Sequence, residues 1–362
     1  MSGINAAIEP NPAEDAKHFI SALRDRCSWP IFREALKRAR LSTGLGWVEL
    51  EGTAAETTTN GAKLRQLLRE YYFEHLIAGE RYIQLYEMPA IDKKRLLTAL
   101  GLATVPKSDF QDTYPLPLSL KRLPSAPSDP TLVEVRPLDR DDYALVYCSV
   151  RSYDDREKYT FNQLPSHVQQ TYTEIDQLIT VRKVHYQAYD VVVIRPGLNR
   201  IEICIDQPKK SNTERLELAV LSVLRTACQN VPDLEPAFST PAYNVFPAIS
   251  GIYFTHKEGT VRSLSFRTLT GSRKHERMIQ SDDDLRAEKF HQAGAHAVQN
   301  KLKPYELTVE WESKVPEGKF EVTMKALIRE LSSQEPRLYG FYVTANSNPL
   351  LAVAINKIIK YI

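Results

Sequence analysis

Proline is the feature of this 362-residue chain that most restricts how it can fold. Six prolines fall within residues 104–130, and four more fall within residues 232–250. Proline lacks a backbone donor and fixes φ, so this density interrupts both helices and sheet ladders. The two stretches therefore predict a linker at 104–130 and a connection at 232–250, which separate three units at 1–103, 131–231 and 251–362.

The first unit, 1–103, has the apolar spacing of a mainly helical domain. Apolar residues recur at intervals of three and four near Ala62–Ala78, which predicts a helix there and two earlier ones. The second of these begins after Ser28, a suitable N-cap, with Pro30 in its first turn. Two strand-like segments, Trp47–Leu50 and Arg81–Glu87, flank the third helix.

The middle unit, 131–231, is rich in strand patterns. Apolar and polar residues alternate in four segments. These are Tyr143–Arg151, Leu178–Tyr186, Val191–Ile194 and Ile201–Ile205. A Pro-Gly turn between the last two predicts an antiparallel hairpin, and a helix over Thr213–Cys228 follows. Strands covered by a helix indicate an α+β layer.

The last unit, 251–362, repeats that arrangement. A hairpin is expected from Gly251–His256 and Thr260–Thr268, followed by a helix near Asp282–Asn300. Strands near Tyr305–Trp311 and Leu338–Val343 flank a predicted helix over Phe320–Leu331. A final helix over Pro349–Ile362 has an apolar stripe suited to docking on its own domain, or to a partner's groove. The fold class is therefore α+β: a helical N-terminal unit followed by two mixed units with antiparallel sheets covered by helices.

Composition fits an ordinary globular protein with a net charge of +2, so a polyanionic partner would have to be bound by local patches. The four cysteines, Cys27, Cys148, Cys204 and Cys228, are too scattered for a disulfide scaffold or a zinc site. We find no apolar run long enough to span a bilayer and no signal-peptide pattern. The expectation is a multi-domain protein of the cytoplasm, without membrane, metal or cofactor.

The motifs of common enzymes are missing from the sequence, including the phosphate loop, the dinucleotide fingerprint and the nucleophile elbow. One candidate pair is Arg69 and His75 on the third helix. Its spacing is similar to the R-x4–6-H motif of the HEPN ribonucleases, although Glu70 stands where that family usually has a small polar residue. The resemblance implies cleavage of the RNA backbone at a dimer interface; the structural alternative is an exposed arginine and a packed histidine.

A second candidate for chemistry is the acidic strand around Glu202, with Asp190 on the preceding one. It resembles the PD-(D/E)xK nucleases, in which acids on adjacent strands hold a metal ion, but Cys204 stands where that family has its lysine. The alternative is a solvated strand face opposite Ile201 and Ile203. A third group, His291 and His296, has a spacing unsuited to joint chelation, which favours a structural role.

Two basic patches are the strongest pointers to a binding partner. The first lies around the second helix, where four cations repeat at helical intervals opposite the apolar stripe. Its members are Arg26, Arg33, Lys37 and Arg40. The second patch covers the hairpin of the last unit and the loop after it, interrupted by Glu258 and Glu276. Its members are Lys257, Arg262, Arg267, Arg273, Lys274, His275 and Arg277. Such patches can neutralise a phosphate backbone, with Tyr253 and Phe266 as stacking groups, or can be solvated faces.

The leading hypothesis is a non-catalytic, nucleic-acid-binding subunit of a multiprotein assembly, with a protein partner or a second copy of the chain. It depends on positive charge being gathered on a common surface of a nearly neutral molecule. The alternatives are a divergent nuclease, using Arg69/His75 or Asp190/Glu202, and a protein-binding adaptor without affinity for nucleic acid. A role in defence against viruses is a further expectation, which no particular residue carries.

Overall fold

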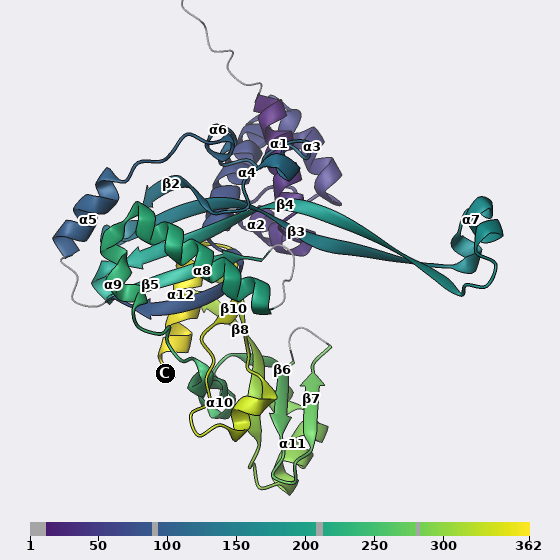
Figure 1. Cartoon of the computed structure of the whole chain (residues 1–362), viewed down its shortest axis with the longest axis vertical. Coiled ribbons are helices and arrows are strands. Elements are labelled where there is room, and N and C mark those ends of the chain that lie inside the picture. Colours follow the sequence, from purple (N-terminus) through teal and green to yellow (C-terminus); the bar gives the residue numbers. More distant parts are fainter. Residues whose placement is uncertain (1–11, 89–92, 208–212, 280–282) are drawn as a thin grey trace, which may run out of the picture.

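A computed structural model describes residues 12–88, 93–207, 213–279 and 283–362, and it shows an α+β chain built around one sheet (Figure 1). The sheet contains ten antiparallel strands in the order β2-β3-β4-β5-β1-β10-β9-β8-β6-β7. The strands are β1 (Gly79–Glu87), β2 (Thr131–Pro137), β3 (Tyr143–Thr160), β4 (Gln177–Arg195), β5 (Arg200–Asp206), β6 (Thr260–Arg267), β7 (Arg273–Arg277), β8 (Lys303–Lys314), β9 (Glu317–Lys325) and β10 (Phe341–Ala345).

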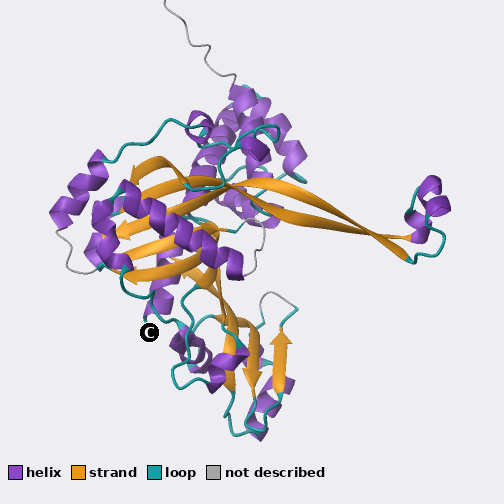
Figure 2. Cartoon of the chain, in the orientation of Figure 1, coloured by secondary structure: helices purple, strands orange, loops and turns teal. Residues whose placement is uncertain are grey.

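Helices are distributed over both faces of this sheet (Figure 2). They are α1 (Pro12–Arg24), α2 (Trp29–Arg38), α3 (Trp47–Ala55), α4 (Thr59–Ile77), α5 (Lys93–Leu102), α6 (Asp109–Thr113), α7 (Ser166–Thr171), α8 (Thr213–Asn230), α9 (Glu235–Phe238), α10 (Phe246–Phe254), α11 (Lys289–Ala297) and α12 (Asn348–Ile359).

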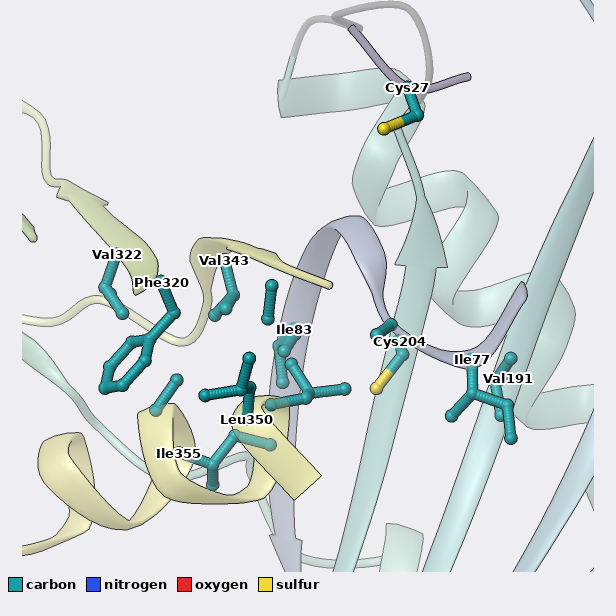
Figure 3. Packing of buried hydrophobic residues seen from close by; sticks show 14 of the residues in the cluster. Cys27, Ile77, Ile83, Val191, Cys204, Phe320, Val322, Val343, Leu350 and Ile355 are labelled. Atoms are coloured by element: carbon teal, nitrogen blue, oxygen red, sulfur yellow. The ribbon is translucent and has the colours of Figure 1, made fainter. Parts of the chain in front are cut away.

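One face of the sheet carries the larger core, which we call the first core. Alternate strand residues such as Val191, Cys204 and Val322 point to it, because successive side chains of a strand point to opposite faces. Figure 3 shows Val322 on the side of Leu350 and Ile355 of α12, and Val191 beside Ile77 further along the same core. Residues of α1–α4, α10 and α12 complete the first core, so helices cover this face along much of its length.

The opposite face carries a second core over half of its length. The intervening residues, including Val192 and Ile203, point to this side and pack against α5, α8 and α9. Its buried strand residues belong to β1 through β5, while those of β6, β8 and β9 belong to the first core. The second face is therefore covered by helices near β5 and has no buried apolar cluster over β6–β9 among the described residues.

The expected α+β class is confirmed, and so are several elements. The helix predicted over Ala62–Ala78 is α4, whose N-cap Thr58 accepts a hydrogen bond from the Gly61 amide at 3.1 Å. The helix predicted over Thr213–Cys228 is α8, and the predicted hairpin is the β4–β5 pair. The last helix is α12, and its apolar stripe docks on the chain's own sheet.

Three expected elements are wrong because a different periodicity governs their burial. Gly251–His256 was expected as a strand, but most of it belongs to helix α10, which begins with Pro247 in its first turn. Phe320–Leu331 was expected as a helix, but β9 buries Phe320, Val322 and Met324 at every second residue. Trp47–Leu50, expected as a strand, begins helix α3.

The helix expected near Asp282–Asn300 is shorter than predicted. Residue 282 lies outside the described residues, and a 3-10 turn at Leu285–Ala287 precedes α11. The side chain of Glu288 accepts a hydrogen bond from the His291 amide at 2.6 Å, so it caps the start of α11.

The three sequence units share a single sheet. Strand β1, from the first unit, pairs with β5 of the middle unit on one side and with β10 of the last unit on the other. Gly79 makes this insertion possible: its φ of +68° lets the chain turn from α4 into β1. The proline-rich stretches therefore separate segments of sequence that hydrogen bonding joins again in the centre of the molecule.

Strands β3 and β4 continue beyond the sheet as a long two-stranded arm (Figures 1 and 2). Pairing runs from Tyr143↔Ile194 in the sheet to Thr160↔Gln177 near the tip, where α7 lies. Ile179 and Val181 are more than half exposed on the arm. A ribbon of two strands has no core of its own, so its pairing alone stabilises it weakly.

No helix within the described residues is both long and apolar enough to cross a membrane.

Candidate nucleic-acid interface

The uncovered part of the second face, over β6–β9, is the open face of the molecule. Directly paired residues of antiparallel strands lie on the same face, so the register identifies its members. Ser265 pairs with His275 on one side and with Glu306 on the other, and Glu306 pairs with Lys325. Thr323 pairs with Tyr342, which packs against the second core and so shows that the two regions share one side of the sheet.

Three cations form a row across one end of this face. Arg267 of β6 pairs with Arg273 of β7 and with Lys303 of β8. Adjacent strands are about 4.8 Å apart, so the row places like charges in neighbouring positions. We call Arg267, Arg273 and Lys303 the basic row.

The basic row is accessible to solvent and carries its charge without a carboxylate. Arg273 and Lys303 are exposed and Arg267 is half-buried. Arg273 donates to the Tyr305 hydroxyl at 2.7 Å, and Arg267 donates to the Ser332 hydroxyl at 3.3 Å. These partners are neutral, and no carboxylate of the described residues forms an ion pair with a member of the row.

The remaining members of the predicted C-terminal patch do not belong to the basic row. Arg277 pairs with Ser263 on the open face, and exposed Lys274 pairs with Phe266 at the edge strand β7. Arg262 donates to the Asp283 carbonyl at 3.0 Å. Lys257 precedes β6, ten residues before Arg267, which corresponds to roughly 30 Å along an extended strand.

The proposed N-terminal row does not form as expected. Arg26 lies in the turn before α2, and its guanidinium is buried in an ion pair with Asp206, with 8% of the side chain exposed. The helical intervals placed Arg26 on α2, but that helix begins only at Trp29. Arg26 is therefore a structural residue and not a surface cation.

Arg33, Lys37 and Arg40 are exposed at α2, as the helical pattern predicts. Lys37 pairs with Glu34 at 2.7 Å, and Arg40 follows the helix with φ of +56°. The buried residues of α2 belong to the first core, on the other side of the sheet from the open face. The two basic patches of the sequence therefore do not share one surface.

The two aromatic residues considered for base stacking point into the first core. Phe266 and Tyr253 are both more than nine-tenths buried. The hydroxyl of Tyr253 lies 2.8 Å from His291 Nε2, and His291 Nδ1 lies 2.5 Å from Glu276. Burial raises the pKa of Tyr253 to about 12, so this hydroxyl stays protonated at neutral pH. Exposed His296 takes no part in this chain of contacts.

The Arg69/His75 pair is not brought together as a site. His75 lies in the last turn of α4 with its side chain buried. Arg69, on the same helix, is exposed, and its guanidinium lies 5.9 Å from the centre of the Phe19 ring. Burial, with the nearby charges of Arg26 and Arg81, lowers the pKa of His75 to about 3. A neutral, enclosed imidazole cannot reach an RNA backbone at the surface.

Asp190 lies in an ionic cluster where the arm leaves the sheet, which we call the arm-root cluster. Its members are Arg26, Arg81, Arg151, Asp190 and Asp206. The carboxylate of Asp190 accepts from the Asp206 amide at 3.0 Å, and that of Asp206 accepts from the Tyr189 amide at 2.8 Å. The two side chains replace ladder bonds where the β4–β5 pairing ends, at Val191↔Cys204.

Burial and the neighbouring charges act in opposite directions on the pKa values of the two carboxyl groups of the arm-root cluster. Burial would raise the pKa of Asp206, but the guanidinium groups of Arg26 and Arg81 outweigh it and lower that pKa. Burial raises the pKa of Asp190 in spite of its ion pair with Arg151.

Glu202 belongs to a different buried cluster. Its Oε1 atom accepts from Arg195 Nε and Arg200 Nε, each at 2.8 Å. Glu202 and Asp190 are both fully buried, which corrects the expectation of a solvated strand face. The face that carries Glu202 is covered by the helices of the first core, where Arg195 neutralises the acid. Asp190 points to the opposite face of the sheet and is neutralised by Arg151. Within the described residues no three His, Cys, Asp or Glu side chains form a group that could hold a metal ion.

The residues that sequence reasoning missed are the cations brought in from β8 and β9. Lys303 and Lys325 lie far along the chain from Arg267 and reach the open face through strand pairing. The alternation of Glu306, Thr308 and Glu310 with apolar residues in β8 was the available signal, because it marks a strand with one uncovered face.

Comparison with known proteins gave no relative: no protein-family model matches the chain, and no curated protein matches it either.

Proposed function

We propose that this chain is a non-catalytic, nucleic-acid-binding subunit of a cytosolic protein assembly, and that the basic row on the open face binds the phosphate backbone. The observation that carries the proposal is the pairing of Arg267 with both Arg273 and Lys303. Like charges in directly opposite positions destabilise a sheet. A polyanion bound across the row would relieve this repulsion and release its own counterions.

The surroundings of the row support binding rather than catalysis. The carboxylates considered for a nuclease, Asp190 and Glu202, are fully buried and each is neutralised by arginine. His75 is enclosed as well. The row's own neighbours on the open face are Ser265 and Glu306. The Ser265 hydroxyl donates to Glu306 at 3.0 Å, and that carboxylate also pairs with Lys325 at 3.6 Å, away from the row.

Fluorescence anisotropy with labelled single-stranded DNA, double-stranded DNA and RNA tests this proposal at two salt concentrations. Three phosphate contacts on a duplex predict a roughly 40-fold loss of affinity when salt rises from about 50 to 200 mM. The double variant Arg267→Glu with Arg273→Glu should lose most of the affinity and flatten the salt dependence.

The matched control reverses two charges on the other side of the sheet, Arg33→Glu with Lys37→Glu on α2. It changes the net charge equally and should retain the wild-type affinity, because α2 does not border the open face. Equal losses in both double variants, or wild-type affinity in the β6–β7 variant, would overturn the proposal.

The assembly part of the proposal rests on the arm, and its partner is a second copy of the chain. The exposed residues Ile179 and Val181 lie two positions apart on β4, so they share one face of the ribbon. On the face of Ile179 and Val181 their direct partners on β3 are Lys158 and Arg156. The Asp155–Arg182 ion pair at 2.8 Å lies on the other face of the ribbon. A second arm packed on this face would cover the exposed apolar side chains of Ile179 and Val181, which a polyanion would leave in water.

Sedimentation equilibrium tests the arm contact. Val181→Lys should shift the chain towards the monomer, while Thr180→Lys, which adds the same charge on the other face of the same strand, should not. A monomeric wild-type chain, or equal effects of the two variants, would contradict an arm-mediated dimer and leave the nucleic-acid proposal untouched.

A further inference from the structure

A cavity of about 400 Å³ lies where the arm meets the body, between the second face of the sheet and helix α8. Ser149 and Arg151 of β3 and Tyr186 of β4 line it on the sheet side, and Arg215 and Ser222 line it on the α8 side. Cavities that bind small molecules span roughly 300–1,000 Å³, so this one, the arm-root pocket, is large enough for a small ligand.

The lining of the arm-root pocket is positively charged. Two arginines, Arg151 and Arg215, reach it, and none of its lining residues is acidic. Arg215 donates to the carbonyl of Ser152 at 3.3 Å, which holds its guanidinium at the mouth of the pocket. A small ligand that enters therefore meets two guanidinium groups, and that of Arg151 also pairs with Asp190 behind the pocket wall.

The arm-root cluster behind the pocket adds to this charge. It contains three arginines and two aspartates, so one positive charge among its members has no acidic counterpart. Arg151 is the member that faces the pocket, with 19% of its side chain exposed, while Arg81 and Asp206 are enclosed. Arg151 is largely buried, so its attraction for an anion in the pocket is screened less by water and salt than that of a surface charge.

Hydroxyl groups make phosphate the anion that fits best. Ser149, Ser152 and Ser222 line the pocket together with the two arginines. Guanidinium groups bind phosphate oxygens in bidentate fashion, and serine hydroxyls donate to the remaining oxygens. The ring of Tyr186 and the side chain of Leu218 give the rest of a ligand an apolar wall.

We propose that the arm-root pocket binds a small phosphate monoester, with its phosphate between Arg151 and Arg215 and its organic part against Tyr186. Arg151 also donates to the Asp206 carbonyl at 3.2 Å and pairs with Asp190, so the ligand would fix the point at which the arm leaves the sheet. The proposal is independent of the basic row, which lies on β6–β8.

Isothermal titration calorimetry with AMP, ribose 5-phosphate, adenosine and inorganic sulfate tests the proposal on the full chain. The two phosphate esters should bind and adenosine should not. Equal affinity for AMP and ribose 5-phosphate would assign the site to sugar phosphates, and tighter binding of AMP would assign it to nucleotides. Binding of adenosine as tight as that of AMP, or no gain of either ester over sulfate, would overturn the proposal.

Two variants locate the binding at the pocket. Arg215→Gln should weaken AMP binding by about tenfold or more, the loss of a charge-assisted hydrogen-bonded pair. Its control is Arg225→Gln on the same helix, outside the pocket lining, where Arg225 lies 3.7 Å from exposed Asp129. Equal affinities of these two variants would overturn the proposal.

Ser222→Glu provides a test that retains both arginines. It places a carboxylate in the pocket, which should compete with the phosphate and abolish binding while the thermal stability of the ligand-free chain is kept or raised. Retention of wild-type AMP affinity in this variant would show that the ligand binds elsewhere. Neither pocket variant should change the salt-dependent affinity for nucleic acid.

Discussion

The arginines in the centre of the sheet and those on the open face have the same chemistry but opposite surroundings. Arg81 in β1 is 1% exposed and forms an ion pair with Asp206, whose carboxylate also holds Arg26. Arg273 in β7 is exposed and donates to a neutral tyrosine. A buried guanidinium needs a carboxylate, whereas an exposed one is hydrated and keeps its charge available to a ligand.

This difference separates structural cations from candidate binding cations. Arg26 and Asp206 are 180 residues apart in the chain, and their contact fastens the turn before α2 to the end of β5. Arg195 and Arg200 likewise reach from the sheet to Asn348 and Asn356 of α12. The central arginines join distant segments, whereas Arg267 and Arg273 form no ion pair with a carboxylate in the part of the chain that the structure describes.

The largest effect that the comparison predicts is that of Asp206→Asn. The substitution removes the negative charge from between Arg26 and Arg81 and leaves both guanidinium groups buried. Breaking a buried pair in this way costs about 3–5 kcal/mol, which urea unfolding monitored by circular dichroism would measure.

Its control removes the acidic partner of an exposed pair. Glu34→Gln unpairs Lys37 on α2, where both side chains are about half exposed, and should leave the free energy of unfolding nearly unchanged. A comparable loss in the two variants would mean that the distinction between central and exposed arginines has no energetic basis.

A smaller effect is expected at Glu258, a buried acid near the turn before β6. It accepts hydrogen bonds from Trp311 Nε1 and Tyr361 and pairs with Lys357 at 2.7 Å. Burial would raise its pKa, but these donors outweigh burial and lower the pKa to about 2. A depressed pKa means that the carboxylate stabilises the fold above its ordinary pKa of 4.5, and that this stability is lost as pH falls towards 2.

Glu258→Gln should therefore cost about 2 kcal/mol at neutral pH, and the difference from the wild type should shrink on acidification. Urea titrations at several pH values measure both quantities. Glu335→Gln, which unpairs exposed Arg337, is the control and should give a small, flat difference. A difference at Glu258 that grows on acidification would reverse the assigned sign.

The sequence predicted the α+β class and the regular apolar elements, and it missed most of the partners of charged groups. α4 and α8 were predictable because their apolar periods agree with their burial. The alternation around Glu202 correctly marked a strand, but the pattern could not show that helices cover its polar side. The prediction that Arg26 is a surface cation was wrong for a related reason, because its partner Asp206 is brought to it only by tertiary structure.

The open face also shows that a sequence pattern does not specify which distant strands pair. Arg267 and Arg273 were both assigned to the C-terminal patch, but Arg273 was expected in the loop after the hairpin, whereas it begins β7 and pairs with Arg267. Lys303 joins them only because β8 lies beside β6, a pairing that a propensity pattern does not specify. Glu258 and Glu276 appeared to interrupt the basic patch, but both turn away from it, towards Lys357 and His291 respectively.

A modest effect on stability with a clear effect on binding is expected for Lys303→Glu. The new carboxylate faces Arg267 across the strands, so attraction replaces repulsion and the fold should gain about 0.5 kcal/mol. Nucleic-acid affinity should fall, and the slope of log affinity against log salt should decrease by about 1.

Lys314→Glu on the same strand is the matched control. It faces Glu317, so the same substitution creates a like-charge pair there and should lower stability by a similar amount without changing the salt slope. If both variants shifted stability in the same direction, repulsion within the basic row would not be the cause of either change.

A similarly small effect on stability is expected from shortening the arm, the part of the molecule with the fewest buried groups. Replacing residues 155–182 by Asn-Gly would close β3 and β4 with a two-residue turn next to the Asp154↔Lys183 pair and remove the outer arm. The arm buries little apolar surface, so the free energy of unfolding should change by no more than about 1 kcal/mol.

A longer replacement, 150–187, would also remove Arg151 and Gln187. It should destabilise the chain as Asp206→Asn does, because it leaves Asp190 buried without its arginine. Thermal unfolding of the two deletions side by side would show where the arm ends and the ionic centre of the sheet begins.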